Sequence, residues 1–134
     1  MAQAEHLPIY KRAYDLCLYL EQVVAGFSRY HKYALGADLR ESARRALKLV
    51  VRANSRSDRV PLLLELREEL EALKVLLRLC HDTKAFQSFN SFEHAITLVV
   101  EIAKQNEGWL KSQRQGPGQN RRAMPGGLAA PSAP

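Results

Sequence analysis

The sequence predicts an all-α protein, an antiparallel up-down four-helix bundle. Four segments carry apolar residues at the 3.6-residue period of an amphipathic helix. No alternating run bounded by turn residues indicates a strand. Short polar segments separate the four helices, and short connections place successive helices side by side in opposite directions. A chain of 134 residues suits a single domain, which we expect over residues 1–113.

The first two helices are predicted over about residues 8–28 and 37–54. Pro8 suits a first helical turn, and Asp38 lies where the helix dipole favours an acid. The apolar stripe of the first helix comprises Ile9, Ala13, Leu16, Cys17, Leu20, Val23, Val24 and Phe27. The inward face of the second comprises Leu39, Ala43, Ala46, Leu47, Val50 and Ala53. The segment SRYHKYALG between them is predicted to be a loop.

The other two helices are predicted over about residues 58–83 and 91–113. Ser57 or Asp58 is the expected N-cap of the third helix, with Pro61 in its first turn. Its core side comprises Leu62, Leu63, Leu66, Leu70, Leu73, Leu77 and Cys80. Asn90 and Glu93 resemble a capping box for the fourth helix. Its stripe comprises Phe92, Ala95, Ile96, Val99, Ile102, Ala103, Trp109 and Leu110, and close packing is the expected reason for Gly108. Residues 114–134 are predicted to form a disordered, basic Gly/Pro-rich tail.

Positive charge is concentrated in one part of the chain. Residues 29–59 hold nine basic residues and three acids, whereas residues 60–110 hold five basic residues and eight acids. Like charges four apart on a helix repel each other. Five cations of the second helix nevertheless fall within an arc of roughly 140° on a helical wheel; they are Arg40, Arg44, Arg45, Lys48 and Arg52. This asymmetry indicates a localised anionic partner.

The candidate binding residues extend this stripe into the flanking loops. They are Arg29, Lys32, Arg40, Arg44, Arg45, Lys48, Arg52 and Arg56. Arginine predominates, which suits bidentate contacts to phosphate, and nucleic acid is the obvious large polyanion. Tyr30, His31 and Tyr33 precede the stripe; their rings could stack on unpaired bases or pack against the end of the bundle. We expect binding based on shape and charge, with a strong salt dependence.

Two other roles are open for the basic stripe. It could form salt bridges across the bundle or between subunits, or it could be a solvated outer face. Apart from Asp38 in the first turn, Glu41 is the only acid within the helix, so pairing inside the helix cannot neutralise the stripe. Acids on the third helix could neutralise part of it.

The sequence contains no catalytic or metal-binding motif. It has no Gly-rich phosphate loop, HExxH, GxSxG or CxxC. We therefore expect no enzyme activity, cofactor or metal site. Cys17 and Cys80 lie among apolar residues and are predicted to be buried free thiols. No apolar run approaches the length of a membrane span, and the first residues lack the apolar core of a signal peptide. These features predict a cytoplasmic protein without a membrane partner.

Several segments, taken in order, resemble a known family. A basic loop precedes LGADLRESARRALKLVVRAN, a Leu-rich helix ends in LKVLLRLCHD, and SFEHAITLVVEIAKQNEGWLK follows. Over about residues 8–112 the chain resembles the accessory variability determinant (Avd) proteins of diversity-generating retroelements. The pieces LLRLCHD, FEHA and GWLK are packing patterns, not catalytic motifs. The same bundle superfamily includes proteins encoded in intervening sequences of ribosomal RNA genes.

The resemblance implies a particular assembly and function. Avd proteins are four-helix bundles that assemble as homopentameric barrels with a basic surface, in bacteria or their phages. They bind the retroelement's reverse transcriptase and its template RNA, or the RNA paired with cDNA. As non-catalytic accessory proteins they support the mutagenic cDNA synthesis that diversifies a target gene (mutagenic retrohoming). The alternative is a four-helix-bundle scaffold, or a protein of the rRNA-intervening-sequence type, that acts through protein contacts without nucleic acid.

Overall fold

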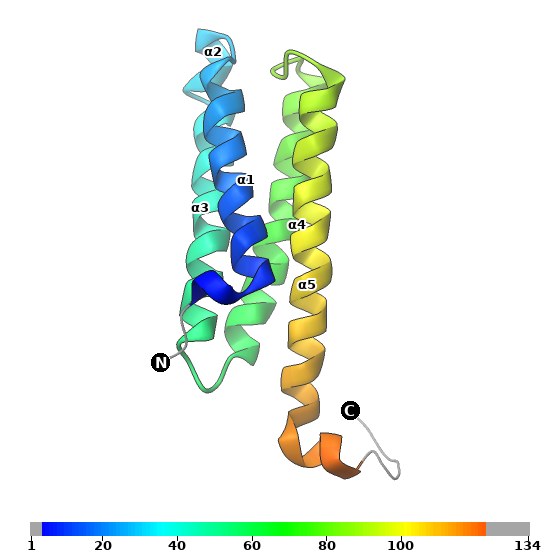
Figure 1. The fold of residues 1–134 in the computed structure, drawn as a ribbon. Helices are drawn as coiled ribbons and strands as arrows, with labels where there is room; N and C mark the ends of the chain where they lie inside the picture. Colours follow the sequence, from blue (N-terminus) through cyan, green and yellow to red (C-terminus); the bar gives the residue numbers. More distant parts are fainter. Residues whose placement is uncertain (1–3, 123–134) are drawn as a thin grey trace.

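The computed structural model describes the backbone of residues 4–122 and the side chains of residues 4–115 (Figure 1). Over this range the chain is helical and contains no strand, which confirms the all-α prediction. The elements are η1 (Ala4–His6), α1 (Pro8–Ala25), α2 (Arg29–Lys32), α3 (Leu35–Asn54), α4 (Val60–Asp82) and α5 (Phe89–Arg122).

The four long helices form an antiparallel bundle. Helix α1 packs against α3 and α5, and α4 packs against the same two helices, so the order around the bundle is α1, α3, α4, α5. Short turns join α3 to α4 and α4 to α5, while α2 lies in the connection between α1 and α3 (Figure 1). The α1–α3 and α4–α5 turns therefore lie at the same end of the bundle.

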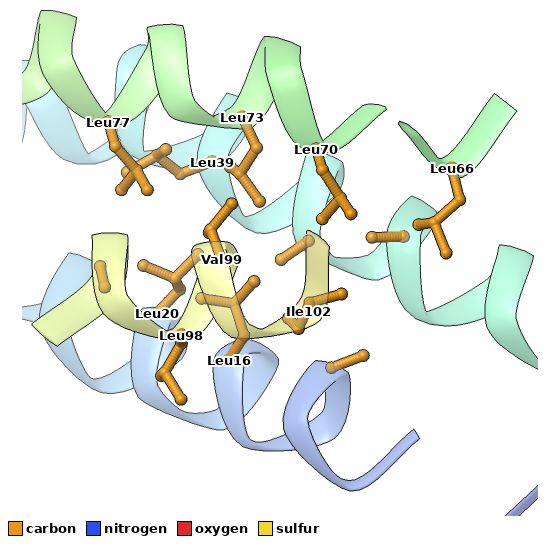
Figure 2. Packing of buried hydrophobic residues seen from close by; sticks show 14 of the residues in the cluster. Leu16, Leu20, Leu39, Leu66, Leu70, Leu73, Leu77, Leu98, Val99 and Ile102 are labelled. Carbon is orange, nitrogen blue, oxygen red and sulfur yellow. The ribbon is translucent and has the colours of Figure 1, made fainter. Parts of the chain in front are cut away.

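Leucine side chains fill the space between the helices (Figure 2). Leu16 and Leu20 of α1 face Leu73 and Leu77 of α4 across the interior, and Ile102 of α5 packs beside them. On α4 the seven predicted core residues are the seven buried ones. On α3 the structure adds Leu49 to the buried set and leaves Leu47 only partly buried. The apolar period thus sets which face of each helix points inward.

Several predicted helix ends need correction. Residues Arg29–Lys32, predicted to be loop, form the short helix α2, because the Ser28 hydroxyl accepts a hydrogen bond from the His31 backbone amide at 3.4 Å. The N-cap of α4 is Arg59, not Ser57 or Asp58. The predicted capping box at Asn90 is also wrong. Helix α5 begins at Phe89, and the Ser88 hydroxyl accepts from the Ser91 amide at 3.1 Å.

The two helical glycines have different environments. A Cβ on Gly36 would lie 2.6 Å from Cγ1 of Val24, so the missing side chain lets the start of α3 approach α1 closely. At Gly108 a Cβ would meet nothing within 4 Å, so close packing, the reason expected from the sequence, is wrong there. Helix α5 continues to Arg122, past the predicted boundary at 113. The rest of the predicted tail, residues 123–134, lies outside the described residues.

Candidate nucleic-acid interface

The eight predicted binding residues follow one edge of the molecule from end to end. Arg29 and Lys32 belong to α2, Arg56 follows the last turn of α3, and the other five lie on α3. Helix α3 has 20 residues, which corresponds to a length of about 30 Å. The cations therefore extend from the α2 end of the bundle to the opposite end (Figure 1).

As far as Arg45, at the middle of α3, the cations are paired with acids of the same chain, and we call this part of the helix its N-terminal half. Arg40 and Arg44 both reach Glu21 of α1, at 3.6 and 3.2 Å. Arg45 pairs with Glu69 of α4 and with Glu41, each at 3.1 Å. Glu41 lies on α3 itself, whereas the contacts to Glu21 and Glu69 are the cross-bundle salt bridges that the sequence left open as an alternative. They tie α3 to both of its neighbours.

Glu69 is the most constrained acid of this group. One of its carboxylate oxygens accepts a hydrogen bond from the fully buried Ser42 hydroxyl at 2.6 Å, and the other accepts from Arg45 at 3.1 Å. The hydrogen bond to Glu69, together with the charges of nearby acids, raises the pKa of Arg45 above its ordinary value. Ser42 thus has its buried hydroxyl satisfied, and Arg45 has a structural role.

In the C-terminal half of α3 the cations are left unpaired. Within residues 4–115, the side chains of Lys48, Arg52 and Arg56 form no ion pair, and all three are exposed. Arg29 and Lys32 of α2 are likewise without an acidic partner in that range. Five of the eight candidates therefore keep their charge available to another molecule, at the two ends and along the outer face of α3.

Arg59, the ninth cation of the basic region, serves the fold. Its guanidinium donates to the carbonyl oxygens of Arg56 at 2.9 Å and Asn54 at 3.1 Å, at the end of α3. It also lies 5.7 Å from the centre of the Trp109 ring. Arg59 therefore joins the end of α3 to α5.

Two tyrosines project from the α2 end of this edge. Tyr30 is 80% exposed and Tyr33 is 70% exposed, so packing against the end of the bundle, the alternative considered for them, does not describe these two rings. His31 is partly buried and makes an edge-to-face contact with Tyr30. Exposed aromatic rings beside Arg29 and Lys32 form a surface on which unpaired bases could stack.

A comparison with protein families identifies the chain. A family model described as bAvd-like matches residues 7–113, which include α1, α3, α4 and residues 89–113 of α5. The chain belongs to the bAvd-like family. The resemblance to Avd proteins, read from the sequence, is thereby confirmed, and Avd-type proteins are of an accessory, non-catalytic kind. No curated protein matches the chain.

The two cysteines of this bAvd-like chain form no disulfide with each other. Burial raises the pKa of both thiols, Cys17 and Cys80, to about 11. Both cysteines are free, although Cys17 is only partly buried. Among the described residues, no group of three or more His, Cys, Asp or Glu side chains could hold a metal. No helix in that part of the chain is long and apolar enough to cross a membrane.

Glu21 is the acid at this basic edge that the sequence reasoning missed. It is an exposed acid on α1 that neutralises two of the predicted binding residues, Arg40 and Arg44. The helical period shows that Glu21 faces outward, but not how far α1 is rotated toward α3. The sequence does show that Glu21 lies beside the apolar stripe on the helical wheel. That position predicts a contact with α3 only once the order of the helices around the bundle is known.

Proposed function

We propose that this protein binds the reverse transcriptase and the template RNA of a diversity-generating retroelement and supports mutagenic cDNA synthesis. The membership of residues 7–113 in the bAvd-like family carries the proposal. The unpaired cations of α2 and the C-terminal half of α3 support the RNA part of it, because phosphates are their natural partners. The protein acts as an accessory subunit, and the polymerase performs the chemistry in the cytoplasm.

The contact to RNA is assigned first to the unpaired cations. Arg29, Lys32, Lys48, Arg52 and Arg56 are free of acids of the described chain, whereas Arg40, Arg44 and Arg45 would have to exchange an ion pair for a phosphate. Such an exchange gains less than the capture of a phosphate by an unpaired cation. Tyr30 and Tyr33 add stacking for unpaired bases at the α2 end, which favours single-stranded segments of the template.

The proposed assembly is the homopentamer that the family resemblance implies. Large apolar side chains exposed on the outside of the bundle support self-association, because a monomer would leave them in water. A ring of five copies would repeat the basic edge five times around the particle. Multiple weak phosphate contacts would then combine into tight binding of one long RNA.

Co-expression with the retroelement's reverse transcriptase and template RNA tests the function. We expect the three components to purify together and to make cDNA from the template, and we expect little cDNA when this protein is left out. The size of the particle from light scattering reports its subunit number. A polymerase that makes the same cDNA without this protein, under matched conditions, contradicts the proposal.

A further inference from the structure

The seam between α1 and α3 has an apolar outer edge. Leu18 is 50% exposed, and Tyr14 and Val51 are exposed to a similar extent. The ion pair between Glu21 and Arg44 fixes the alignment of the two antiparallel helices. Counting along both helices from this pair places Leu18 level with the partly buried Leu47, and Tyr14 level with Val51. These four residues define an apolar face that we call the α1/α3 face.

A second apolar face lies on the outside of α4. Val75 is 68% exposed and Leu79 is also exposed. Ala72 is also exposed. It lies three residues before Val75, and Val75 lies four residues before Leu79, so the three side chains share one side of the helix. We call Ala72, Val75 and Leu79 the α4 face. Five of the eight exposed large hydrophobic residues in the described part of the chain belong to these two faces.

The charges beside the two faces are opposite in sign. Lys48, an unpaired cation, neighbours Leu47 and lies three residues before Val51 on α3. On α4, Glu65, Glu68 and Asp82 are exposed and form no ion pair within the described residues, and they outnumber Arg78, an exposed cation beside Leu79 that is likewise unpaired there. Glu68 precedes Val75 by seven residues, which is two helical turns or about 10 Å, so both side chains lie on the same side of α4. One face therefore combines apolar contact with positive charge, and the other combines it with negative charge.

We propose that the α4 face of one copy of this chain docks on the α1/α3 face of a second copy. A contact between two α4 faces would bring Glu68 toward another Glu68, and a contact between two α1/α3 faces would bring Lys48 toward another Lys48. Both are opposed by like charges, whereas the mixed contact is complementary. The contact is heterologous, which means that the two subunits use different faces. A dimer therefore keeps one unused α4 face and one unused α1/α3 face, and all faces are used only when the subunits form a closed ring.

This inference rests on the self-assembly part of the proposed function and is independent of RNA and polymerase binding. It also divides the outer side of α3 between two partners. In the assembled ring Lys48 is used at the subunit contact instead of at the RNA, while Arg52, Arg56 and the cations of α2 stay on the exposed edge for RNA. Each subunit added to the ring then extends the basic edge.

Two variants, each with one face disabled, test the contact. Val75→Asp with Leu79→Asp disables the α4 face, and Leu18→Asp with Val51→Asp disables the α1/α3 face. We expect light scattering to show an oligomer for the unchanged protein and a monomer for each variant alone. An equal mixture of the variants should give a one-to-one heterodimer and nothing larger, because only one complementary pair of intact faces remains.

Three results overturn the inference: an unchanged protein that is monomeric, face variants that keep the size of the unchanged oligomer, or folded variants that stay monomeric when mixed. Circular dichroism establishes that the variants fold, and milder Ser substitutions at the same four positions replace any Asp variant that does not. RNA binding, measured in parallel, separates the two proposals. An oligomer of unchanged size that binds no RNA contradicts the proposed function but leaves the subunit contact intact.

Discussion

The two halves of α3 carry similar numbers of cations but use them differently. In the N-terminal half, Arg40, Arg44 and Arg45 are held by Glu21, Glu41 and Glu69 within the chain. In the C-terminal half, Lys48 and Arg52, followed by Arg56, project from the bundle without an acid partner in the described chain. On a helical wheel these cations form one continuous basic stripe. In the folded molecule, the cations of the N-terminal half form ion pairs and those of the C-terminal half do not.

The difference shows how a positive surface can serve both folding and binding. Paired cations attach α3 to α1 and α4 and contribute little net charge to the surface. Unpaired cations add to the electrostatic potential outside the molecule and gain most when a phosphate arrives. Each prediction below changes one side of this comparison, beginning with the largest expected effect.

Removing charge from the unpaired half should weaken RNA binding most. For Arg52→Gln with Arg56→Gln, we expect affinity for a single-stranded template segment to fall about tenfold or more at 0.1 M salt. The slope of log K against log salt should decrease by about 1.4, or 0.7 for each lost phosphate contact. Fluorescence anisotropy over a range of salt concentrations measures both quantities.

Arg40→Gln with Arg44→Gln is the matched control, because it removes the same number of charges from the paired half. We expect its affinity for RNA to change by less than about threefold, since both arginines are already bound to Glu21. If both double variants lost the same amount of RNA affinity, the proposed difference between the paired and the unpaired half of α3 would be wrong.

Disrupting the paired half should affect stability instead of RNA binding. Glu69→Gln weakens the hydrogen bonds to the buried Ser42 hydroxyl and to Arg45. We expect a loss of about 1–2 kcal/mol in the free energy of unfolding, measured with urea. Glu93→Gln, at an exposed acid of α5 that forms no ion pair within the described residues, should change it by less than about 0.5 kcal/mol. A similar cost for both substitutions would show that Glu69 has no special structural role.

Removing the acid that pairs with Arg40 and Arg44 should make these two cations available to bind RNA. Glu21→Gln frees Arg40 and Arg44 and removes a negative charge from the edge of α3. We expect RNA affinity to rise by about two- to threefold and stability to fall by less than about 1 kcal/mol, because these ion pairs are largely exposed. A decrease in RNA affinity would indicate that Glu21 positions these arginines for the RNA.

The smallest effect on stability is expected for an ion pair far from α3. Arg67 of α4 donates two hydrogen bonds to Glu107 of α5, at 2.8 and 2.7 Å, and these hold the pKa of Glu107 below its ordinary value. The pair therefore stabilises the fold above the ordinary glutamate pKa of about 4.3, and this contribution is lost as pH falls through the lowered pKa. In Glu107→Gln, urea unfolding at pH 7 and pH 3 should differ less than in the unchanged protein. An identical pH dependence in both proteins contradicts this assignment.

The inward faces of the helices were predictable, and α4 shows why. Its seven buried residues recur at helical spacing among charged neighbours, so local sequence alone separates its two sides. Short-range capping was less predictable. At the start of α5 it is Ser88, not Asn90, that accepts a backbone amide, and the N-cap of α4 is Arg59, although the sequence offers Ser57 and Asp58 as suitable polar residues there.

Pairing across the bundle could not be obtained from single helices. Whether Glu21 meets Arg44, or Glu69 meets Arg45, depends on the order of the helices and their relative rotation. The same information is needed to bring Tyr14 beside Val51 and so to define an apolar face. The sequence therefore indicated that α3 is basic, and the fold was needed to distinguish its paired cations from its unpaired ones.

Crosslinking of template RNA to the protein tests the central claim most directly. The purified complex is irradiated, digested and analysed by mass spectrometry to identify the crosslinked peptides. We expect crosslinks on α2 and on the C-terminal half of α3, at Tyr30, Tyr33 and the peptides that contain Arg52 and Arg56. Crosslinks confined to α4 and α5, or to the paired half of α3, would contradict the account.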